Sequence, residues 1–127
     1  MIGYGERVLD HYRRPRNEGS LPAPQIRHED LNPLCGDRVR IELELEEGER
    51  VGAAKFRADG CILCRAACSI LTEQIAGSAL SAIEGLETAG FIGSLQVDLR
   101  PARVRCVVLP LEVLQAGIAA YRRGKVP

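Results

Sequence analysis

The chain has 127 residues, of which 46% are hydrophobic and 27% charged, and its 17 basic and 17 acidic side chains give a formal net charge of zero. These values are typical of one globular domain, so we expect a single domain over residues 1–127. The balanced charge disfavours a broad nucleic-acid-binding surface, which needs a basic excess. Because the chain has no run of about 18 consecutive apolar residues and no apolar segment at its start, we expect a cytoplasmic protein that is not inserted in a membrane.

The N-terminal region predicts a short amphipathic helix. Tyr4, Val8 and Tyr12 recur at four-residue steps, so they would form one apolar stripe on a helix over residues 4–14. Pro15 follows this pattern at once, and we expect the helix to end there.

The next region alternates apolar and polar residues and predicts strands. Residues 38–46 give the clearest pattern, with one face buried and the other in contact with solvent. The apolar set is Val39, Ile41, Leu43 and Leu45, and the polar set is Arg40, Glu42, Glu44 and Glu46. A turn at residues 47–49 leads to a second strand over residues 50–58, and residues 26–31 are compatible with a third.

The second half of the chain has the pattern of helices. Residues 62–75 contain good helix formers and no proline, and residues 78–93 fit one or two short helices interrupted by glycines. A last amphipathic helix is expected to begin at Cys106, with Pro110 in its first turn, where a missing backbone N–H is tolerated. Strands followed by helices indicate an α+β fold.

Three cysteines and one aspartate stand at the edges of these elements. Five cysteines cannot all form internal disulfides, and a reducing compartment would keep them as thiols. Cys35 and Asp37 precede the long strand, while Cys61 and Cys106 stand at expected helix N-termini, which stabilise thiolates. Three thiolates and a carboxylate suit tetrahedral zinc, and three thiolates with a labile fourth ligand suit an iron–sulfur cluster. The alternative from spacing alone is that these are buried packing cysteines.

Three sequence segments occur together and in order. They are Asn32-Pro33-Leu34-Cys35-Gly36-Asp37, then Gly60-Cys61 followed by Ala66, Ser69, Thr72 and Glu73, then Pro101-Ala102-Arg103-Val104-Arg105-Cys106. The set resembles the IscU/SufU family of iron–sulfur cluster assembly scaffold proteins, which is NifU N-terminal-like, and the resemblance covers nearly the whole chain. It implies a small three-stranded antiparallel sheet packed by helices, with the site at one end.

The resemblance also implies a site and its partners. Cys35, Asp37, Cys61 and Cys106 would bind the metal, with the three cysteines holding a cluster. Cys35 would be the preferred sulfur acceptor and Cys106 the alternative. The chain would be a scaffold or sulfur carrier without turnover of its own. It would take sulfane sulfur from a cysteine desulfurase and pass sulfur or cluster to a downstream scaffold or to apo-proteins, using zinc or a transient [2Fe-2S] cluster.

One residue distinguishes the two branches of this family. The position before the last cysteine is histidine in IscU-type proteins and lysine in SufU-type proteins, and here it is Arg105, which stays protonated and cannot ligate. That favours the SufU-like zinc relay, and Arg105 could pair with Asp37 when no metal is bound. The segment between Cys61 and Cys106 is too short for the insertion typical of SufU, so both modes stay open.

Two further cysteines allow other readings. Cys64 and Cys68 share one helical stripe with Cys61, so they are either extra ligands or relay thiols, or small buried residues, which we favour. Cys61 and Cys64 also match the spacing of a thiol–disulfide oxidoreductase. A structural zinc module that binds a protein partner is the remaining alternative.

Overall fold

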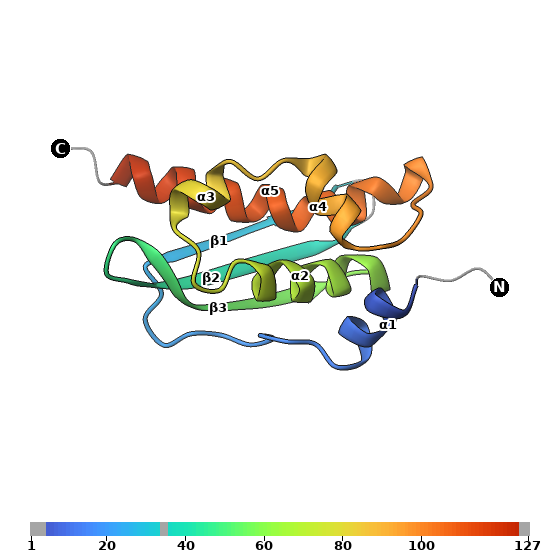
Figure 1. Cartoon of the computed structure of the whole chain (residues 1–127), viewed down its shortest axis with the longest axis horizontal. Helices are drawn as coiled ribbons and strands as arrows, with labels where there is room; N and C mark the ends of the chain where they lie inside the picture. Colours follow the sequence, from blue (N-terminus) through green and yellow to red (C-terminus); the bar gives the residue numbers. More distant parts are fainter. Residues whose placement is uncertain (1–4, 34–35, 125–127) are drawn as a thin grey trace.

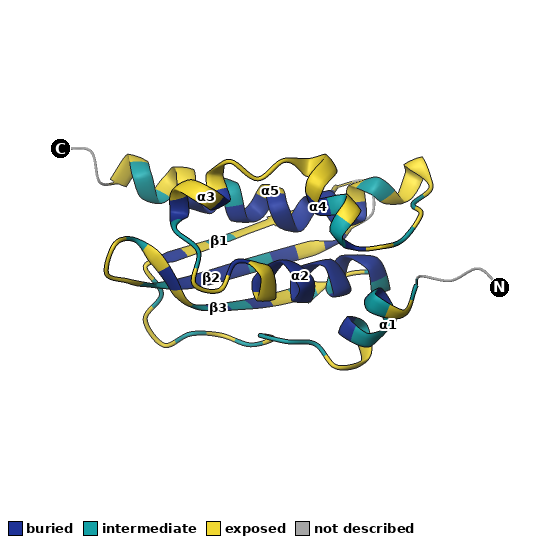
Figure 2. Cartoon of the chain, in the orientation of Figure 1, coloured by how far each residue is buried: buried dark blue, intermediate teal, exposed yellow. Residues whose placement is uncertain are grey.

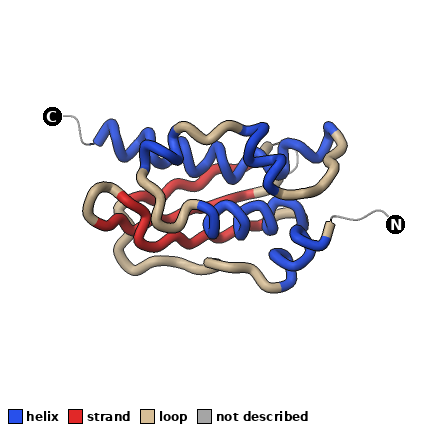
Figure 3. Tube along the Cα trace, in the orientation of Figure 1, coloured by secondary structure: helices blue, strands red, loops and turns tan. Residues whose placement is uncertain are grey.

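The computed structural model describes residues 5–33 and 36–124 and consists of an antiparallel sheet with helices packed on one face (Figures 1 and 3). The strands are β1 (Ile26–Leu31), β2 (Arg38–Glu46) and β3 (Arg50–Asp59). The helices are α1 (Glu6–Arg13), α2 (Ile62–Gln74), α3 (Leu80–Glu84), α4 (Thr88–Ser94) and α5 (Pro101–Gly124). This is the α+β fold with a three-stranded sheet that the sequence resemblance implied.

The strand register brings several chain segments to one end of the sheet. The strand order is β1-β2-β3, and both neighbouring pairs are antiparallel. Arg38, at the start of β2, pairs with Leu31 at the end of β1 and with Asp59 at the end of β3. The loop between β1 and β2 and the start of α2 therefore lie at the same end of the sheet.

The core lies between the inner face of the sheet and two helices. Helix α5 packs over β1 and β2, helix α2 packs over β3, and α1 packs against α2. Figure 2 shows dark blue, buried segments on the facing sides of these helices and strands. Val39, Ile41, Leu43 and Phe56 are each at most 1% exposed, as expected for apolar residues on one face of β2 and β3.

The N-terminal helix is confirmed, with Glu6–Arg13 as its bounds, and Tyr4 of the predicted stripe lies outside the described residues. Val8 is buried and Tyr12 packs against the core from its edge. The other buried side chain of α1 is His11, which contacts Ser69 of α2. The apolar stripe thus joins α1 to α2.

The predicted start of the last helix was wrong. Helix α5 begins at Pro101, five residues before Cys106, because proline suits the first helical position and the residues that follow continue the helix. Pro110 consequently lies in the helix interior and not in the first turn. By length and composition α5 is also the one helix among the described residues that could span a membrane, yet more than half of its apolar window is buried against the sheet and the other helices.

The charged face of β2 is not fully exposed as predicted, because Glu42 is 4% exposed. Residues 17–19 pair with the edge of β3, and the chain then runs past the outer face of the sheet to β1. The Leu21 N–H donates to Glu42 Oε1 at 2.7 Å, and Oε2 lies 3.2 Å from Arg27 Nε and 3.3 Å from Arg40 Nε. This crossing segment covers Glu42, and the two guanidinium groups offset the cost of burying its charge.

Candidate metal centre

Three potential ligands from three different elements meet at the end of the sheet. Asp37 precedes β2 and is 5% exposed, Cys61 is the N-cap of α2 and is half-buried, and Cys106 lies in α5 and is 5% exposed. One ligand atom from each lies within 4.8 Å of the others. The Cys61 thiol donates to Asp37 Oδ2 over 3.9 Å. Of the predicted site residues, the structure therefore brings together Asp37, Cys61 and Cys106, and Cys35 lies outside the described residues.

Backbone hydrogen bonds position Asp37 next to the other candidate ligands. The Asn32 N–H donates to the Asp37 carbonyl at 2.8 Å, and the Gly36 N–H donates to the Asn32 carbonyl at 2.7 Å. Gly36 has a φ of +78°, a conformation that glycine adopts without strain. These bonds hold the backbone of Asp37 at a defined place beside the start of α2.

Gly60 makes the space in which the Asp37 carboxylate sits. A Cβ on Gly60 would lie 2.8 Å from both Asp37 Cγ and Oδ1, closer than real Cβ contacts allow. A side chain at the residue before Cys61 would therefore displace the Asp37 carboxylate from its place beside Cys61.

The buried position of Cys106 disfavours the ionised form of its thiol. Burial, followed by the nearby Cys61 thiol and Asp37 carboxylate, raises the pKa of Cys106 to about 12, while the Arg103 side chain acts in the opposite direction. This corrects the expectation that a helix N-terminus stabilises the Cys106 thiolate, because the helix begins a full turn earlier. Arg103 is not among the site residues expected from the sequence, although its i, i+3 spacing from Cys106 on a helix is a usable signal.

These residues fit a zinc ion or an iron–sulfur cluster. A tetrahedral zinc ion with a Zn–S bond of about 2.3 Å and a Zn–O bond of about 2.0–2.2 Å holds the sulfur and oxygen roughly 3.5–3.7 Å apart, close to the 3.9 Å between Cys61 Sγ and Asp37 Oδ2. Thiolates and a carboxylate are suitable donors for zinc, and thiolates are the usual ligands of iron–sulfur clusters. A bound cation would also favour the ionised form of the buried Cys106 thiol.

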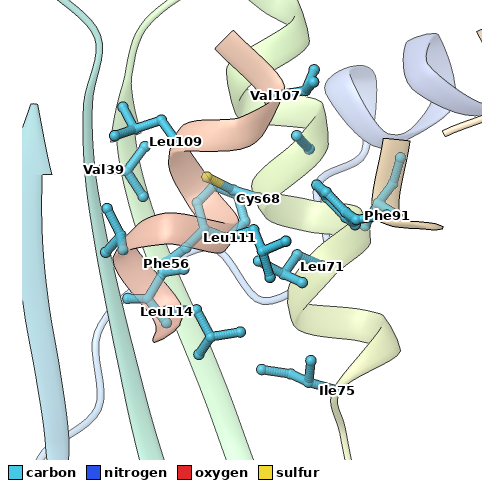
Figure 4. Close-up of a cluster of buried hydrophobic side chains, with 14 of the residues drawn as sticks. Val39, Phe56, Cys68, Leu71, Ile75, Phe91, Val107, Leu109, Leu111 and Leu114 are labelled. Atoms are coloured by element: carbon cyan, nitrogen blue, oxygen red, sulfur yellow. The ribbon is translucent and has the colours of Figure 1, made fainter. Parts of the chain in front are cut away.

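Cys64 and Cys68 are part of the core. Both are fully buried, and Figure 4 shows Cys68 among apolar side chains that include Leu71 and Leu111. A hydrogen bond with Cys68, and then burial, raises the pKa of the Cys64 thiol far above its usual range. Because a thiol that stays protonated is a poor nucleophile, these cysteines are better explained as small buried core residues than as part of a redox pair.

The other polar residues singled out in the sequence lie away from the three ligands or act structurally. Arg105 does not pair with Asp37, because its two guanidinium nitrogens donate to Glu112 at 2.9 and 3.3 Å. His11 is 3% exposed and its Nδ1 lies 2.8 Å from Ser69 Oγ, which joins α1 to α2.

The outer face of the sheet carries a separate cavity of about 210 Å³. Its lining is Glu18, Glu29, Arg38, Arg40, Arg57, Ala58 and Asp59. None of the three candidate ligands lines it, and its acidic and basic groups are evenly matched. Among the described residues, the group of Asp37, Cys61 and Cys106 is therefore the better candidate for a metal centre.

Residues 3–126 match the model of the NifU-like N-terminal domain. The chain is 36% identical to the zinc-dependent sulfurtransferase SufU of Bacillus subtilis, over 95% of this chain and 92% of that protein. It is 32% identical to the iron–sulfur cluster assembly scaffold protein IscU of Haemophilus influenzae, over 95% and 97%. The crystal structure of a SufU scaffold protein from Fervidobacterium islandicum has the same fold, with a TM-score of 0.74, 23% identity, and coverage of 91% of this chain and 96% of that one.

Proposed function

We propose that this chain, which belongs to the family of NifU-like N-terminal domains, accepts sulfane sulfur from a cysteine desulfurase for iron–sulfur cluster assembly. It then passes sulfur or an assembled cluster to a downstream scaffold or to apo-proteins. Two of its relatives bear the names of the two ways to do this, a zinc-dependent sulfurtransferase and a cluster scaffold.

The observation that carries this proposal is the convergence of two thiols and a carboxylate. Asp37, Cys61 and Cys106 come from three distant parts of the chain, yet their ligand atoms lie within 4.8 Å of one another. Cys35, proposed as the fourth ligand from the sequence alone, stands two residues before Asp37. A half-buried thiol beside two buried ligands suits a site that must both hold its cargo and remain reachable by a donor.

The sulfur transfer step is a thiol exchange. A thiolate of the site attacks the terminal sulfur of the persulfide on the desulfurase, forms a new S–S bond, and releases the donor cysteine as a thiolate, so no oxidant or reductant is consumed. Cys35 is our preferred acceptor and Cys106 the alternative. Zinc bound by these residues would supply the stabilisation that keeps the acceptor ionised.

We favour the zinc relay over cluster building, and Arg105 is the reason. Its guanidinium cannot bind a metal, and it is held by Glu112. The site then has three cysteines and Asp37 as its candidate ligands, which completes a tetrahedral zinc site. Cluster building remains the second candidate, because three thiolates with an exchangeable carboxylate can also hold a transient cluster.

Metal and sulfide analysis after purification without oxygen tests which mode operates. Zinc at one equivalent without sulfide supports the relay, and iron with equal sulfide supports the scaffold.

Sulfur loading tests the shared proposal. The protein is incubated with a cysteine desulfurase and free cysteine, and mass spectrometry counts the added sulfur atoms. Cys35→Ser, Cys61→Ser and Cys106→Ser should reduce loading, whereas Cys68→Ser, a matched change of a buried cysteine outside the site, should not. Equal loading of all four variants and the native protein would rule the proposal out.

A further inference from the structure

Pro110 removes a backbone hydrogen bond at the residue that carries a candidate ligand. In an α-helix the N–H of one residue donates to the carbonyl four residues earlier. Proline has no N–H, and its ring presses against that same carbonyl. Because Pro110 lies inside α5, the carbonyl that loses its donor is that of Cys106.

Side-chain packing holds this turn of the helix in place. Every residue from 106 to 111 is buried, and Val107, Leu109 and Leu111 are 0%, 4% and 1% exposed. Figure 4 shows Leu109 beside Val39 of the sheet and Leu111 beside Leu71 of α2. The preceding turn, residues 101–105, is exposed apart from the half-buried Val104. The helix is therefore weakly held by its own backbone at the point where it leaves the core.

Cys106 is almost inaccessible in this closed arrangement. The exposed fraction of the residue is 5%, so Cys106 offers little surface to a sulfur donor or a metal carrier. Access needs a local opening, and local openings occur where few backbone hydrogen bonds must break.

We propose that Pro110, by leaving the Cys106 carbonyl without its donor, acts as a hinge that lets the exposed first turn of α5 and Cys106, residues 101–106, open and present Cys106 to a partner while residues 107–111 stay packed in the core. The purpose of this opening rests on the proposed function, whereas the opening itself is a property of the fold. The released turn also carries Arg103, which favours the Cys106 thiolate, so the thiol and its cationic neighbour would move together.

Thiol alkylation measures the opening directly. The full chain is reduced, stripped of metal with a chelator and treated with iodoacetamide for increasing times, and mass spectrometry of digested protein gives the rate at each cysteine. Cys64 and Cys68, which are fully buried in the core, report global unfolding in the same sample. We expect Cys106 to react at least ten-fold faster than either of them.

Two substitutions restore the missing N–H. Pro110→Ala should slow alkylation of Cys106 by about ten-fold or more relative to Cys64 and Cys68, because its amide can bond to the Cys106 carbonyl. Pro110→Val keeps a side chain closer in volume to the proline ring, and it should give the same slowing if loss of volume destabilises the alanine variant. Gly90→Ala, in α4, is the matched control, because its Cβ would meet no atom within 4 Å and it favours a helix away from Cys106.

The hinge proposal is refuted if Cys106 reacts no faster than Cys64 and Cys68 in the native protein. It is overturned equally if both Pro110 variants leave the relative rate at Cys106 unchanged. The measurement uses no desulfurase and no bound metal, so its failure would not affect the proposed function, and failed sulfur loading would not affect the hinge.

Discussion

Adding one methyl group at Gly60 should weaken metal binding without unfolding the protein. In a Gly60→Ala variant the Cβ would lie 2.8 Å from Asp37 Cγ and Oδ1, so the carboxylate would have to move by about 0.6 Å to reach an ordinary contact of 3.4 Å. Metal–ligand distances usually lie within about 0.2 Å of their standard values, and changes to groups that orient a ligand typically cost 10- to 100-fold in affinity. We therefore expect a loss of zinc affinity of about 1.4–2.7 kcal/mol.

Competition between the protein and a chromogenic zinc chelator measures this loss, and circular dichroism checks that the variant is folded. Gly90→Ala serves again as the control, because nothing lies within 4 Å of its added Cβ. The reasoning about the space beside Asp37 is refuted if folded Gly60→Ala binds zinc within two-fold of the native affinity.

Three further predictions concern stability, measured by urea unfolding. Burial, with a contribution from Arg16, lowers the pKa of His11. As the pH falls, the unfolded chain therefore binds a proton at this histidine before the folded protein does, and the free energy of unfolding should decrease below about pH 6.5. His11→Gln should weaken this dependence, and an unchanged pH profile would contradict it. Phe56→Ala should cost about 3–5 kcal/mol, because Phe56 is 1% exposed in the core, and a cost under 1 kcal/mol would show that the site is loosely packed. Glu42→Gln should cost about 1–3 kcal/mol by removing the buried negative charge that pairs with two guanidinium groups, while Glu44→Gln, on a half-exposed neighbour in β2, should change stability by less than about 0.5 kcal/mol; equal effects would show that burial does not matter here.

The strands could be predicted closely because their signal is local. Alternation over residues 38–46 gives the same bounds as β2, since a strand places successive side chains on opposite faces, and the third strand expected over residues 26–31 coincides with β1. The burial of Glu42 could not be predicted in this way. It depends on the segment near Leu21, distant in sequence, that covers one part of the outer face.

The start of α5 was mispredicted for a related reason. The start expected at Cys106 follows from the apolar periodicity after that residue, with Pro110 in the first turn, where a missing N–H is locally tolerated. In the fold, the burial of Val107, Leu109 and Leu111 stabilises the helix through the proline, so it extends back to Pro101. Tertiary packing outweighed the local preference, and it placed Cys106 inside a buried turn.

The sequence by itself determined the chemistry available to this protein. It supplied the order of the elements, and its resemblance to a known family indicated Cys35, Asp37, Cys61 and Cys106 as the ligands. Only the tertiary structure decided that Asp37, Cys61 and Cys106 share one small volume, how deeply each is buried, and that Arg105 turns away to Glu112. Residue type and spacing are properties of the chain, but distances between remote atoms and their exclusion from water arise only when the sheet and helices pack together.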